Sequence, residues 1–231
     1  MAEAPSHDSY HGVIFDLDGV IVDTEHLWEE SWAAYCAGHG TAWTREDTAT
    51  VQGMSAPEWA AHIAALLGDP HSADQVNGAC VGYVVNAVAA GRGPLMTGAR
   101  ELVLAVSDLV PVAVASSAAR RVIDAVLTHH GLAEVLATTV SSEEVPHGKP
   151  SPDVYAEAAR RIGVAAGRAV AVEDSGNGVR AAHAAGLHVV AIPNRVYPPS
   201  PAALGLADHI AADHAAARAC VLGHIVTGGA R

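Results

Sequence analysis

The sequence is poor in basic residues, and lysine in particular is almost absent. Lysine and arginine together number 13 against 25 aspartates and glutamates, which gives a formal net charge of −12 for 231 residues. A chain with this surplus repels the phosphates of nucleic acid and of anionic membranes, so we expect neither as a partner. An anionic ligand would need a local cation, and Lys149 is the only lysine in the chain.

Long apolar runs and paired cysteines are also missing. Although 50% of the residues are hydrophobic, no stretch approaches the ~20 consecutive apolar residues of a membrane-spanning helix. Residues 1–8 contain neither the basic region nor the apolar segment of a secretory signal. Cys36, Cys80 and Cys220 form no CxxC motif and are expected to be reduced core residues. These absences predict a cytoplasmic protein, and they leave a monomer and a small homo-oligomer both open.

Helical and strand patterns divide the chain into two kinds of region. Residues 24–91 show helical spacing and turns without a strand signal, whereas helices and apolar strands alternate from residue 99 onward. Strands are expected near residues 13–15, 111–116, 138–140, 169–172, 188–192 and 208–210. Apolar strands joined by helices are typical of a parallel sheet covered on both faces. The predicted fold class is therefore α/β, a doubly wound parallel sheet (residues 1–22 and 94–231) with an inserted all-helical domain (residues 23–93).

Three helix starts can be placed from the sequence. The run Asp23-Thr24-Glu25 is expected to cap the first helix of the inserted domain. Ser55 and Glu58 have the spacing of a capping box. A helix following the strand at 169–172 is expected to run from Gly178 to Ala185.

The first strand, Val13-Ile14-Phe15, runs directly into Asp16, and Asp18 and Gly19 follow. Two carboxylates this close repel each other, so one is usually protonated or both face a cation. The pair therefore indicates a divalent metal, a division of acid and base roles, or both.

Other polar residues follow other strands of the predicted sheet. Ser116 and Ser117 end the second strand, Glu173 and Asp174 end the fourth, and Lys149 lies in the loop after the third. Active sites of open parallel sheets lie outside the carboxyl ends of the strands, so these groups are expected to share one crevice. Carboxylates with room for water suit Mg²⁺, and hydroxyl and ammonium groups suit phosphate oxygens. The set predicts chemistry at phosphorus.

In order and spacing, four segments resemble the four motifs of the haloacid dehalogenase superfamily. They are Asp16-Leu17-Asp18-Gly19-Val20, Ser116, Lys149-Pro150 and Glu173-Asp174-Ser175. The resemblance runs from about Val13 to Asn194, and the inserted helices are similar to the type 1 cap of phosphoglycolate phosphatases, sugar phosphatases and β-phosphoglucomutases.

This resemblance implies a role for each motif residue. Asp16 would be the nucleophile and a metal ligand, and Asp18 would be the general acid/base and bind the metal through its backbone carbonyl. Ser116, with Ser117 beside it, and Lys149 would hold the phosphoryl group. Glu173 and Asp174 would complete a Mg²⁺ site.

The same resemblance narrows which branch of the superfamily the chain is expected to belong to. Dehalogenases lack the second aspartate, which is present here as Asp18, and phosphonatases form a Schiff base with a cap lysine, which is absent here. Both activities are therefore disfavoured. In the cap loop Gln52-Gly53-Met54-Ser55-Ala56, Ala56 stands where β-phosphoglucomutases have an arginine, and Trp28 stands where they have a histidine. The segment around Trp28 looks like bacterial sugar phosphatases of the 2-deoxyglucose-6-phosphate type.

The resulting hypothesis is a Mg²⁺-dependent phosphatase that acts on a small phosphorylated metabolite, most readily a sugar phosphate, through an aspartyl-phosphate. Trp28, Gly53, Met54 and Ser55 are the candidate specificity residues of the cap. Aromatic residues at helical spacing are more often core than ligand contacts. A β-phosphoglucomutase-like phosphomutase and a non-catalytic binding protein with the same fold remain alternatives.

Overall fold

In the computed structural model of this chain, the described residues are 9–51 and 54–225. Their strands form a single six-stranded parallel sheet in the order β3-β2-β1-β4-β5-β6. The strands are β1 (Gly12–Phe15), β2 (Val112–Ser116), β3 (Thr138–Ser141), β4 (Ala169–Glu173), β5 (His188–Ala191) and β6 (His209–Ile210). The predicted doubly wound parallel sheet is confirmed.

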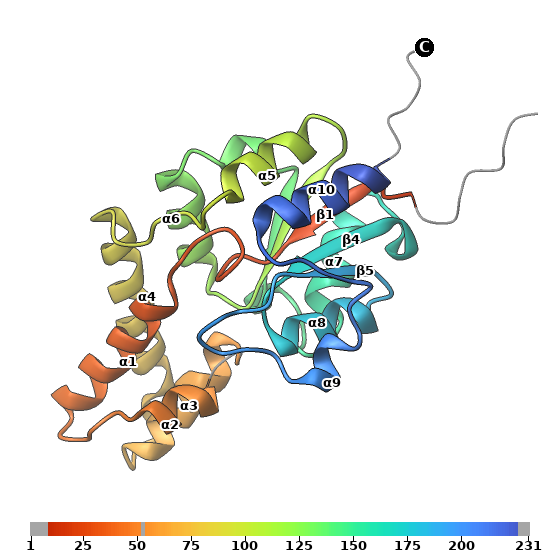
Figure 1. The fold of residues 1–231 in the computed structure, drawn as a ribbon. Coiled ribbons are helices and arrows are strands. Elements are labelled where there is room, and N and C mark those ends of the chain that lie inside the picture. The colour runs from red at the N-terminus through yellow and green to blue at the C-terminus, as the bar shows by residue number, and fades with distance from the viewer. Residues whose placement is uncertain (1–8, 52–53, 226–231) are drawn as a thin grey trace, which may run out of the picture.

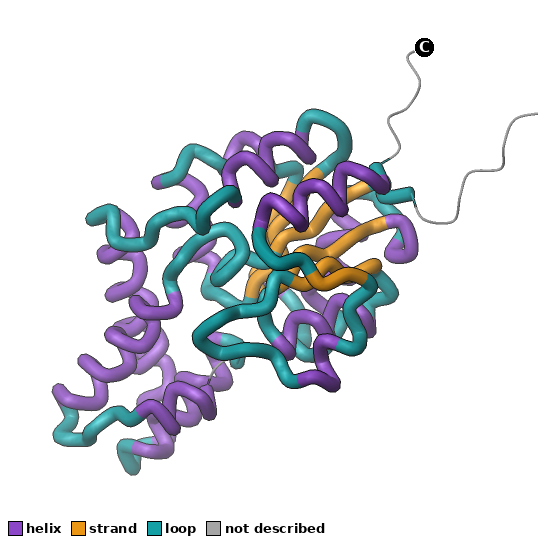
Figure 2. The backbone as a smooth tube through the Cα atoms, viewed as in Figure 1, coloured by secondary structure: helices purple, strands orange, loops and turns teal. Residues whose placement is uncertain are grey.

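Helices cover both faces of the sheet, which Figures 1 and 2 show in the same view. Successive side chains of a strand point to opposite faces, so Val13 and Phe15 of β1 belong to one apolar core and Ile14 belongs to the other. The first core includes residues of α5 (Ala99–Ser107), α6 (Arg120–His129) and α10 (His214–His224). The second includes residues of α7 (Asp153–Arg161) and α8 (Gly176–Ala184). A short helix, α9 (Pro201–Leu204), packs against α8.

Four helices between β1 and α5 lie to one side of the sheet and form the cap (Figure 1). They are α1 (Glu25–Gly38), α2 (Arg45–Val51), α3 (Ala56–Leu66) and α4 (Ala73–Ala89). Helices α1 and α3 both pack against α4, and α4 also contacts α6 of the sheet domain. The boundaries of the inserted domain at residues 23 and 93 stay a prediction.

Short 3₁₀ turns connect several of these elements. They are η1 (Pro70–Ser72), η2 (Ala133–Val135), η3 (Ser142–Glu144) and η4 (Ala166–Arg168). Within the described ranges, no helix combines the length and the apolar character that crossing a membrane requires.

The observed helix starts agree in part with those predicted from the sequence. Ser55 N donates to Glu58 Oε2 at 2.8 Å, which confirms the expected capping box of α3. Thr24 takes the N-cap position of α1, but its hydroxyl donates to Asp18 instead of accepting a hydrogen bond from the helix. Helix α8 begins two residues before the expected Gly178, because Ser175 Oγ accepts from Gly178 N and so caps an earlier start.

Candidate active site

Three acidic side chains from two neighbouring strands lie together at the carboxyl edge of the sheet. Asp16 follows β1, Glu173 ends β4, and Asp174 comes next in the chain. One carboxylate oxygen from each lies within 4.8 Å of the others, and all three residues are buried. Because β1 and β4 are paired in the sheet, these ends must lie side by side. The predicted meeting of distant acidic residues therefore occurs.

Lys149 brings the neutralising charge into this acidic group. Its ammonium lies 2.6 Å from Asp16 Oδ1 and 2.6 Å from Glu173 Oε1, and its side chain is only 4% exposed. Burial lowers the pKa of Lys149, but the two carboxylates outweigh that effect and raise the pKa above its ordinary value. The single lysine of the chain is therefore held charged beside Asp16.

Glu173 is fully buried and is held at both of its oxygens. Tyr155 OH donates to Oε1 at 2.8 Å, and the backbone amides of Asp174 and Ser175 both donate to Oε2 at 3.0 Å. Burial raises the pKa of Glu173, but the Lys149 ammonium and these hydrogen bonds keep it below the usual value. A Cβ atom at Gly178 would lie 1.6 Å from Glu173 Oε1, so only glycine leaves room for the carboxylate.

Asp174 occupies a similarly restricted place. Asn194 Nδ2 donates to its Oδ2 at 2.8 Å. Gly19 has a φ of +79°, and a Cβ there would lie 2.0 Å from Asp174 Oδ2. Glycine is therefore needed at position 19 both for the left-handed backbone and for the close approach of the carboxylate.

Burial disfavours the charged form of the carboxyl groups in this cluster. It raises the pKa of Asp16 to about 7, although the Lys149 ammonium opposes the shift. For Asp174, burial together with the charges of Glu173 and Asp16 raises the pKa well above the ordinary range. The raised pKa values mean that too little positive charge lies nearby to stabilise these carboxylates in their ionised form. A hard divalent cation such as Mg²⁺ would supply that charge. Asp16, Glu173 and Asp174 therefore fit a Mg²⁺ site.

Asp18 has a different setting from Asp16. It is half-buried, and its Oδ1 accepts hydrogen bonds from Thr24 Oγ1 and, at 3.2 Å, from Trp28 Nε1. Burial raises the pKa of Asp18, and these two hydrogen bonds oppose the shift. A carboxyl group with a raised pKa is suited to carry and release a proton.

The two predicted phosphate-binding serines differ in position. Ser116 is fully buried and its Oγ accepts from Ala118 N at 3.0 Å, whereas Ser117 is partly exposed and lines a cavity beside Asp16. Ser142 Oγ donates to the carbonyl of Ser117 at 3.0 Å, and Ser141 Oγ donates to that of Ala118 at 2.7 Å. The loop after β3 thus fixes the backbone of the loop after β2.

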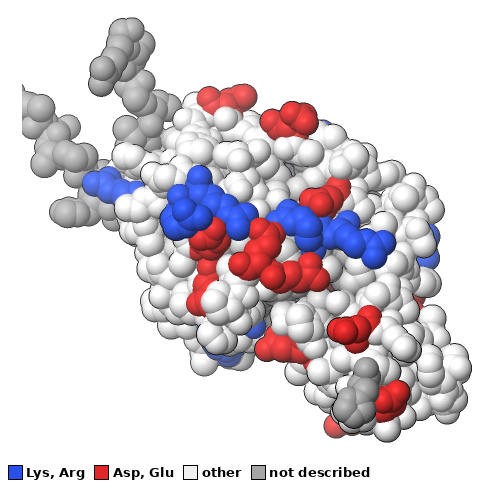
Figure 3. Space-filling view, turned by 180° about the vertical axis from the view of Figure 1, so that it is seen from behind, with Lys and Arg blue, Asp and Glu red and all other residues white. Residues whose placement is uncertain are grey.

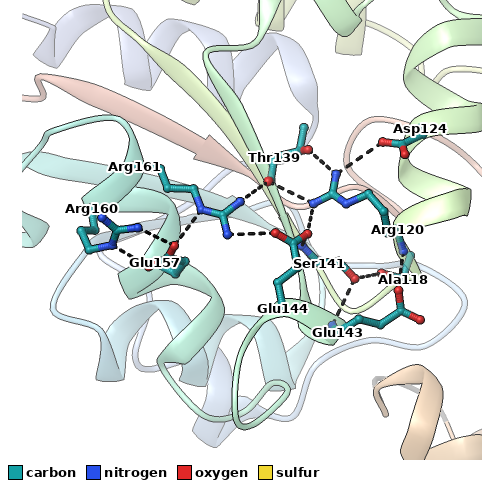
Figure 4. Close-up of polar contacts among 10 residues, drawn as sticks. All are labelled: Ala118, Arg120, Asp124, Thr139, Ser141, Glu143, Glu144, Glu157, Arg160 and Arg161. Atoms are coloured by element: carbon teal, nitrogen blue, oxygen red, sulfur yellow. Dashed lines mark hydrogen bonds and ion pairs between the residues drawn. The ribbon is translucent and has the colours of Figure 1, made fainter.

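Charged side chains on the surface also connect the region after β2 with the region after β3 (Figure 4). Glu144 of η3 pairs with Arg120 of α6 and, at 2.8 Å, with Arg161 of α7. Both arginines also donate to the carbonyl of Thr139 on the edge strand β3, at 3.1 and 3.0 Å. These contacts occupy a backbone acceptor that would otherwise be open to another strand. On the back of the molecule, basic side chains form a band with acidic side chains next to it (Figure 3).

A cavity lies between the cap and the acidic cluster, with about 120 Å³ open to water. Its sheet side includes Asp16, Asp18, Ser117, Lys149 and Asp174, and its cap side includes Glu25, Trp28, Glu29, Trp32, Met54 and Trp59. Cap and sheet domain meet where Tyr197 OH donates to Glu29 Oε1.

Of the four cap residues singled out from the sequence, Trp28 and Met54 line this cavity. Ser55 is buried next to Gly148, where an added Cβ would lie 2.9 Å from Ser55 Cβ, so it meets the lysine loop. Gly53 lies outside the described residues. The specificity roles of these four residues stay a prediction.

Three residues that hold the acidic groups in place were not predicted from the sequence. Tyr155 lies on α7, Asn194 follows β5, and Thr24 begins the cap, and each bonds to one of the acidic side chains. Of these three, Asn194 has a positional signal, because it follows the carboxyl end of β5, at the same edge of the sheet as the other site residues.

Comparison with known proteins agrees with this geometry. Residues 10–186 match the family described as haloacid dehalogenase-like hydrolase. The bifunctional riboflavin kinase/FMN phosphatase of Arabidopsis thaliana is 31% identical over 79% of this chain, which spans only 48% of that longer protein. The fructose-1-phosphate phosphatase YqaB of Escherichia coli (strain K12) is 30% identical over 80% of this chain and 97% of its own length.

Among solved structures, CbbY from Rhodobacter sphaeroides in complex with phosphate is similar with a TM-score of 0.79. Its sequence is 28% identical, and the match covers 89% of this chain and 95% of that one. The phosphatase names of the relatives agree with the predicted enzyme class, a phosphoric monoester hydrolase. Motifs, fold and family match together establish that this chain belongs to the haloacid dehalogenase-like hydrolase family.

Proposed function

We propose that this protein is a Mg²⁺-dependent phosphatase that hydrolyses a small phosphorylated metabolite through an aspartyl-phosphate on Asp16. The observation that supports it most directly is the placement of Asp16. Its carboxylate lies on the cavity wall, bonds to Lys149, and shares an oxygen cluster with Glu173 and Asp174.

Two steps account for the reaction. In the first, a carboxylate oxygen of Asp16 attacks phosphorus, the ester P–O bond breaks, and the Asp18 carboxylic acid gives its proton to the departing alcohol oxygen. In the second, the Asp18 carboxylate takes a proton from water, which attacks phosphorus. The bond between phosphorus and Asp16 then breaks and inorganic phosphate is released.

The surrounding residues support both steps. Lys149 and the loop at Ser117 face the cavity where the phosphoryl oxygens would lie. When bound by Asp16, Glu173 and Asp174, Mg²⁺ supplies positive charge to the phosphoryl oxygens and favours the ionised form of Asp16. Trp28 and Thr24 orient the Asp18 carboxyl, and closure of the cap keeps bulk water away from the acyl phosphate.

A sugar phosphate is the substrate class we favour. A relative that matches 80% of this chain over 97% of its own length is named a fructose-1-phosphate phosphatase. Among the described residues, the cavity wall has no arginine that could hold a second phosphate. That composition favours release of an alcohol over the exchange of two phosphates that a mutase performs.

The test is a phosphate-release screen over phosphorylated sugars and polyols, with Mg²⁺ and with chelator. We expect Asp16→Asn to lose at least ~10³-fold in kcat while remaining folded, as judged by a cooperative thermal transition. Asp124→Asn, an exposed aspartate on α6, is the matched control. Retained turnover in Asp16→Asn would rule out the aspartyl-phosphate route. Isomerisation of a sugar phosphate without phosphate release would support the mutase.

A further inference from the structure

The cap side of the cavity is formed largely by one face of helix α1. Glu25, Trp28, Glu29 and Trp32 all line the cavity, and their spacing of three and four residues places them on a common helix face. The face thus alternates carboxylates with indoles. It contains no basic side chain.

Charge in this cavity is strongly one-sided. Five of the described lining residues are carboxylates, namely Asp16, Asp18, Glu25, Glu29 and Asp174, and Lys149 is the single cation among them. The proposed reaction already uses Lys149 for the phosphoryl group. Arg45, which is close enough to Tyr197 to lower its pKa, is exposed and does not line the cavity. In the proposed reaction Asp16 and Asp174 would hold Mg²⁺ and Asp18 carries a proton, so Glu25 and Glu29 are the carboxylates that make the leaving-group end of the cavity negative.

The two cap carboxylates point to different tasks. Glu25 is near enough to Asp174 to raise its pKa, so it belongs to the acidic end of the cavity. Glu29 lies one helical turn further along α1 and accepts from Tyr197 OH through Oε1. Its second oxygen has no partner among residues 9–51 and 54–225. Glu29 is the carboxylate available to a leaving group.

Aromatic rings surround the same space. The chain has four tryptophans, and all four pack together, with ring centroids 5.7 to 6.1 Å apart. Three of them, Trp28, Trp32 and Trp59, line the cavity. Indole faces attract cations more strongly than other aromatic rings do.

Trp32 contributes its ring to this wall. Its side chain is only 7% exposed, and its Nε1 has almost no surface open to the cavity, so the ring and not the N–H faces a ligand. The charge of Glu29 beside these rings favours a positively charged ligand.

We propose that the leaving group of the preferred substrate carries a protonated amine, as in the phosphate ester of an amino sugar or amino alcohol. The ammonium lies beside Glu29 in the part of the cavity that Trp28, Trp32 and Trp59 line. This inference rests on the proposed phosphatase activity, and it adds the charge of the substrate. Neutral sugars fit the cavity less well, and carboxylates are repelled.

Turnover of matched substrates tests the proposal. Glucosamine 6-phosphate against glucose 6-phosphate, and 2-aminoethyl phosphate against 2-hydroxyethyl phosphate, compare an amine with a hydroxyl at similar size. Carboxymethyl phosphate adds the anionic case. We expect a kcat/KM about tenfold higher for the amine in at least one pair, which corresponds to one cation–π contact assisted by a carboxylate. Carboxymethyl phosphate should be the poorest of the small esters.

Substitution of Glu29 tests whether this residue causes the preference for an amine. In Glu29→Gln the amide retains an oxygen for Tyr197, but the charge is gone, so the amine-to-hydroxyl ratio of kcat/KM should fall most of the way to one. Glu46→Gln removes the same charge from an exposed site on α2 and should keep the ratio. Equal rates for amine and hydroxyl in both pairs, or an unchanged ratio in Glu29→Gln, would overturn the proposal.

A binding measurement separates this inference from the phosphatase itself. Because all four tryptophans lie in the cap cluster, intrinsic fluorescence reports ligand in the cavity. In Asp16→Asn, titration with glucosamine 6-phosphate should give a Kd about tenfold below that of glucose 6-phosphate. Absence of turnover of any phosphate ester by the parent would refute the phosphatase, while this titration would still decide for or against the amine site.

Discussion

Mg²⁺ should stabilise this protein more at pH 8 than at pH 5. The reason is the pair of buried carboxyl groups with raised pKa values, Asp16 at about 7 and Asp174 well above its ordinary range. Below these pKa values both groups hold protons in the folded, metal-free protein, and Mg²⁺ must displace them to bind. The apparent Mg²⁺ affinity should therefore rise tenfold to hundredfold per pH unit between about pH 5 and pH 7, for one or two displaced protons.

The direction in which the stability of the metal-free protein changes with pH follows from the same pKa shifts. A pKa that is higher in the folded state than in the unfolded state contributes stability below the unfolded pKa, and this stability is lost as the pH rises through the folded pKa. For Asp16, whose pKa moves from 3.8 to about 7, the loss is on the order of 4 kcal/mol across that window. Without metal, stability should fall from about pH 4 to about pH 7.

Thermal unfolding with chelator and with Mg²⁺, each at pH 5 and pH 8, measures both effects. Metal at 100 times its Kd adds about 2.7 kcal/mol, which for a chain of this size raises Tm by about 5–10 °C. That gain should appear at pH 8 and be much smaller at pH 5. Asp174→Asn should remove most of it, while Asp108→Asn, an exposed aspartate, should keep it. Equal gains at the two pH values, or a full gain in Asp174→Asn, would refute the reasoning.

Three further changes test the support of the site. Lys149→Met leaves the buried carboxylates without their ammonium and should lower the free energy of unfolding by about 3–5 kcal/mol in urea titrations. Gly178→Ala places a methyl group 1.6 Å from Glu173 Oε1, so calorimetric Mg²⁺ titration should show at least ~10-fold weaker binding. Ser142→Ala removes the hydrogen bond to the Ser117 carbonyl, and steady-state kinetics should show a raised KM with a stability loss of only about 1 kcal/mol.

Each of these three predictions has an outcome that would contradict it. Urea stability of Lys149→Met equal to that of the parent would mean that its ammonium does not compensate the carboxylates. Gly82→Ala is the control for the glycine change, because a Cβ there meets nothing within 4 Å and should leave Mg²⁺ binding intact. Weaker Mg²⁺ binding in both glycine variants would point to a general effect of substitution. An unchanged KM in Ser142→Ala would show that the Ser117 carbonyl bond does not position phosphate.

The fold and the acidic cluster could be predicted from the sequence, because the order of apolar strands and helices implies a parallel sheet and the acidic residues follow its strands. Apolar strands that alternate with helices have few arrangements other than a parallel sheet. Asp16, Glu173 and Asp174 come together because their strands are neighbours in that sheet. Their meeting needed no knowledge of side-chain packing.

Residues that orient the acidic groups could not be found in this way. Tyr155 is one of several buried residues on α7, and only its contact with Glu173 distinguishes it from core. Ser116 and Ser117 are adjacent hydroxyls, and the cavity reaches only the second, because the first is buried at the strand end. Periodicity predicts which face of an element is buried, but not which buried atom meets which partner.

The position of the inserted helices explains why Asp18 depends on the cap. The chain leaves the sheet domain through Val22 and returns through Leu95, and these residues pair as an antiparallel bridge. Thr24 and Trp28, which begin the cap, both donate to the Asp18 carboxylate. A displacement of the cap about this bridge would move both donors away from Asp18 while Asp16, fixed at the end of β1, stayed in place. The proposed proton donor is therefore oriented by cap residues, whereas the proposed nucleophile is held by the sheet, so we expect the Asp18 carboxyl to be aligned with Asp16 when the cap lies over the site.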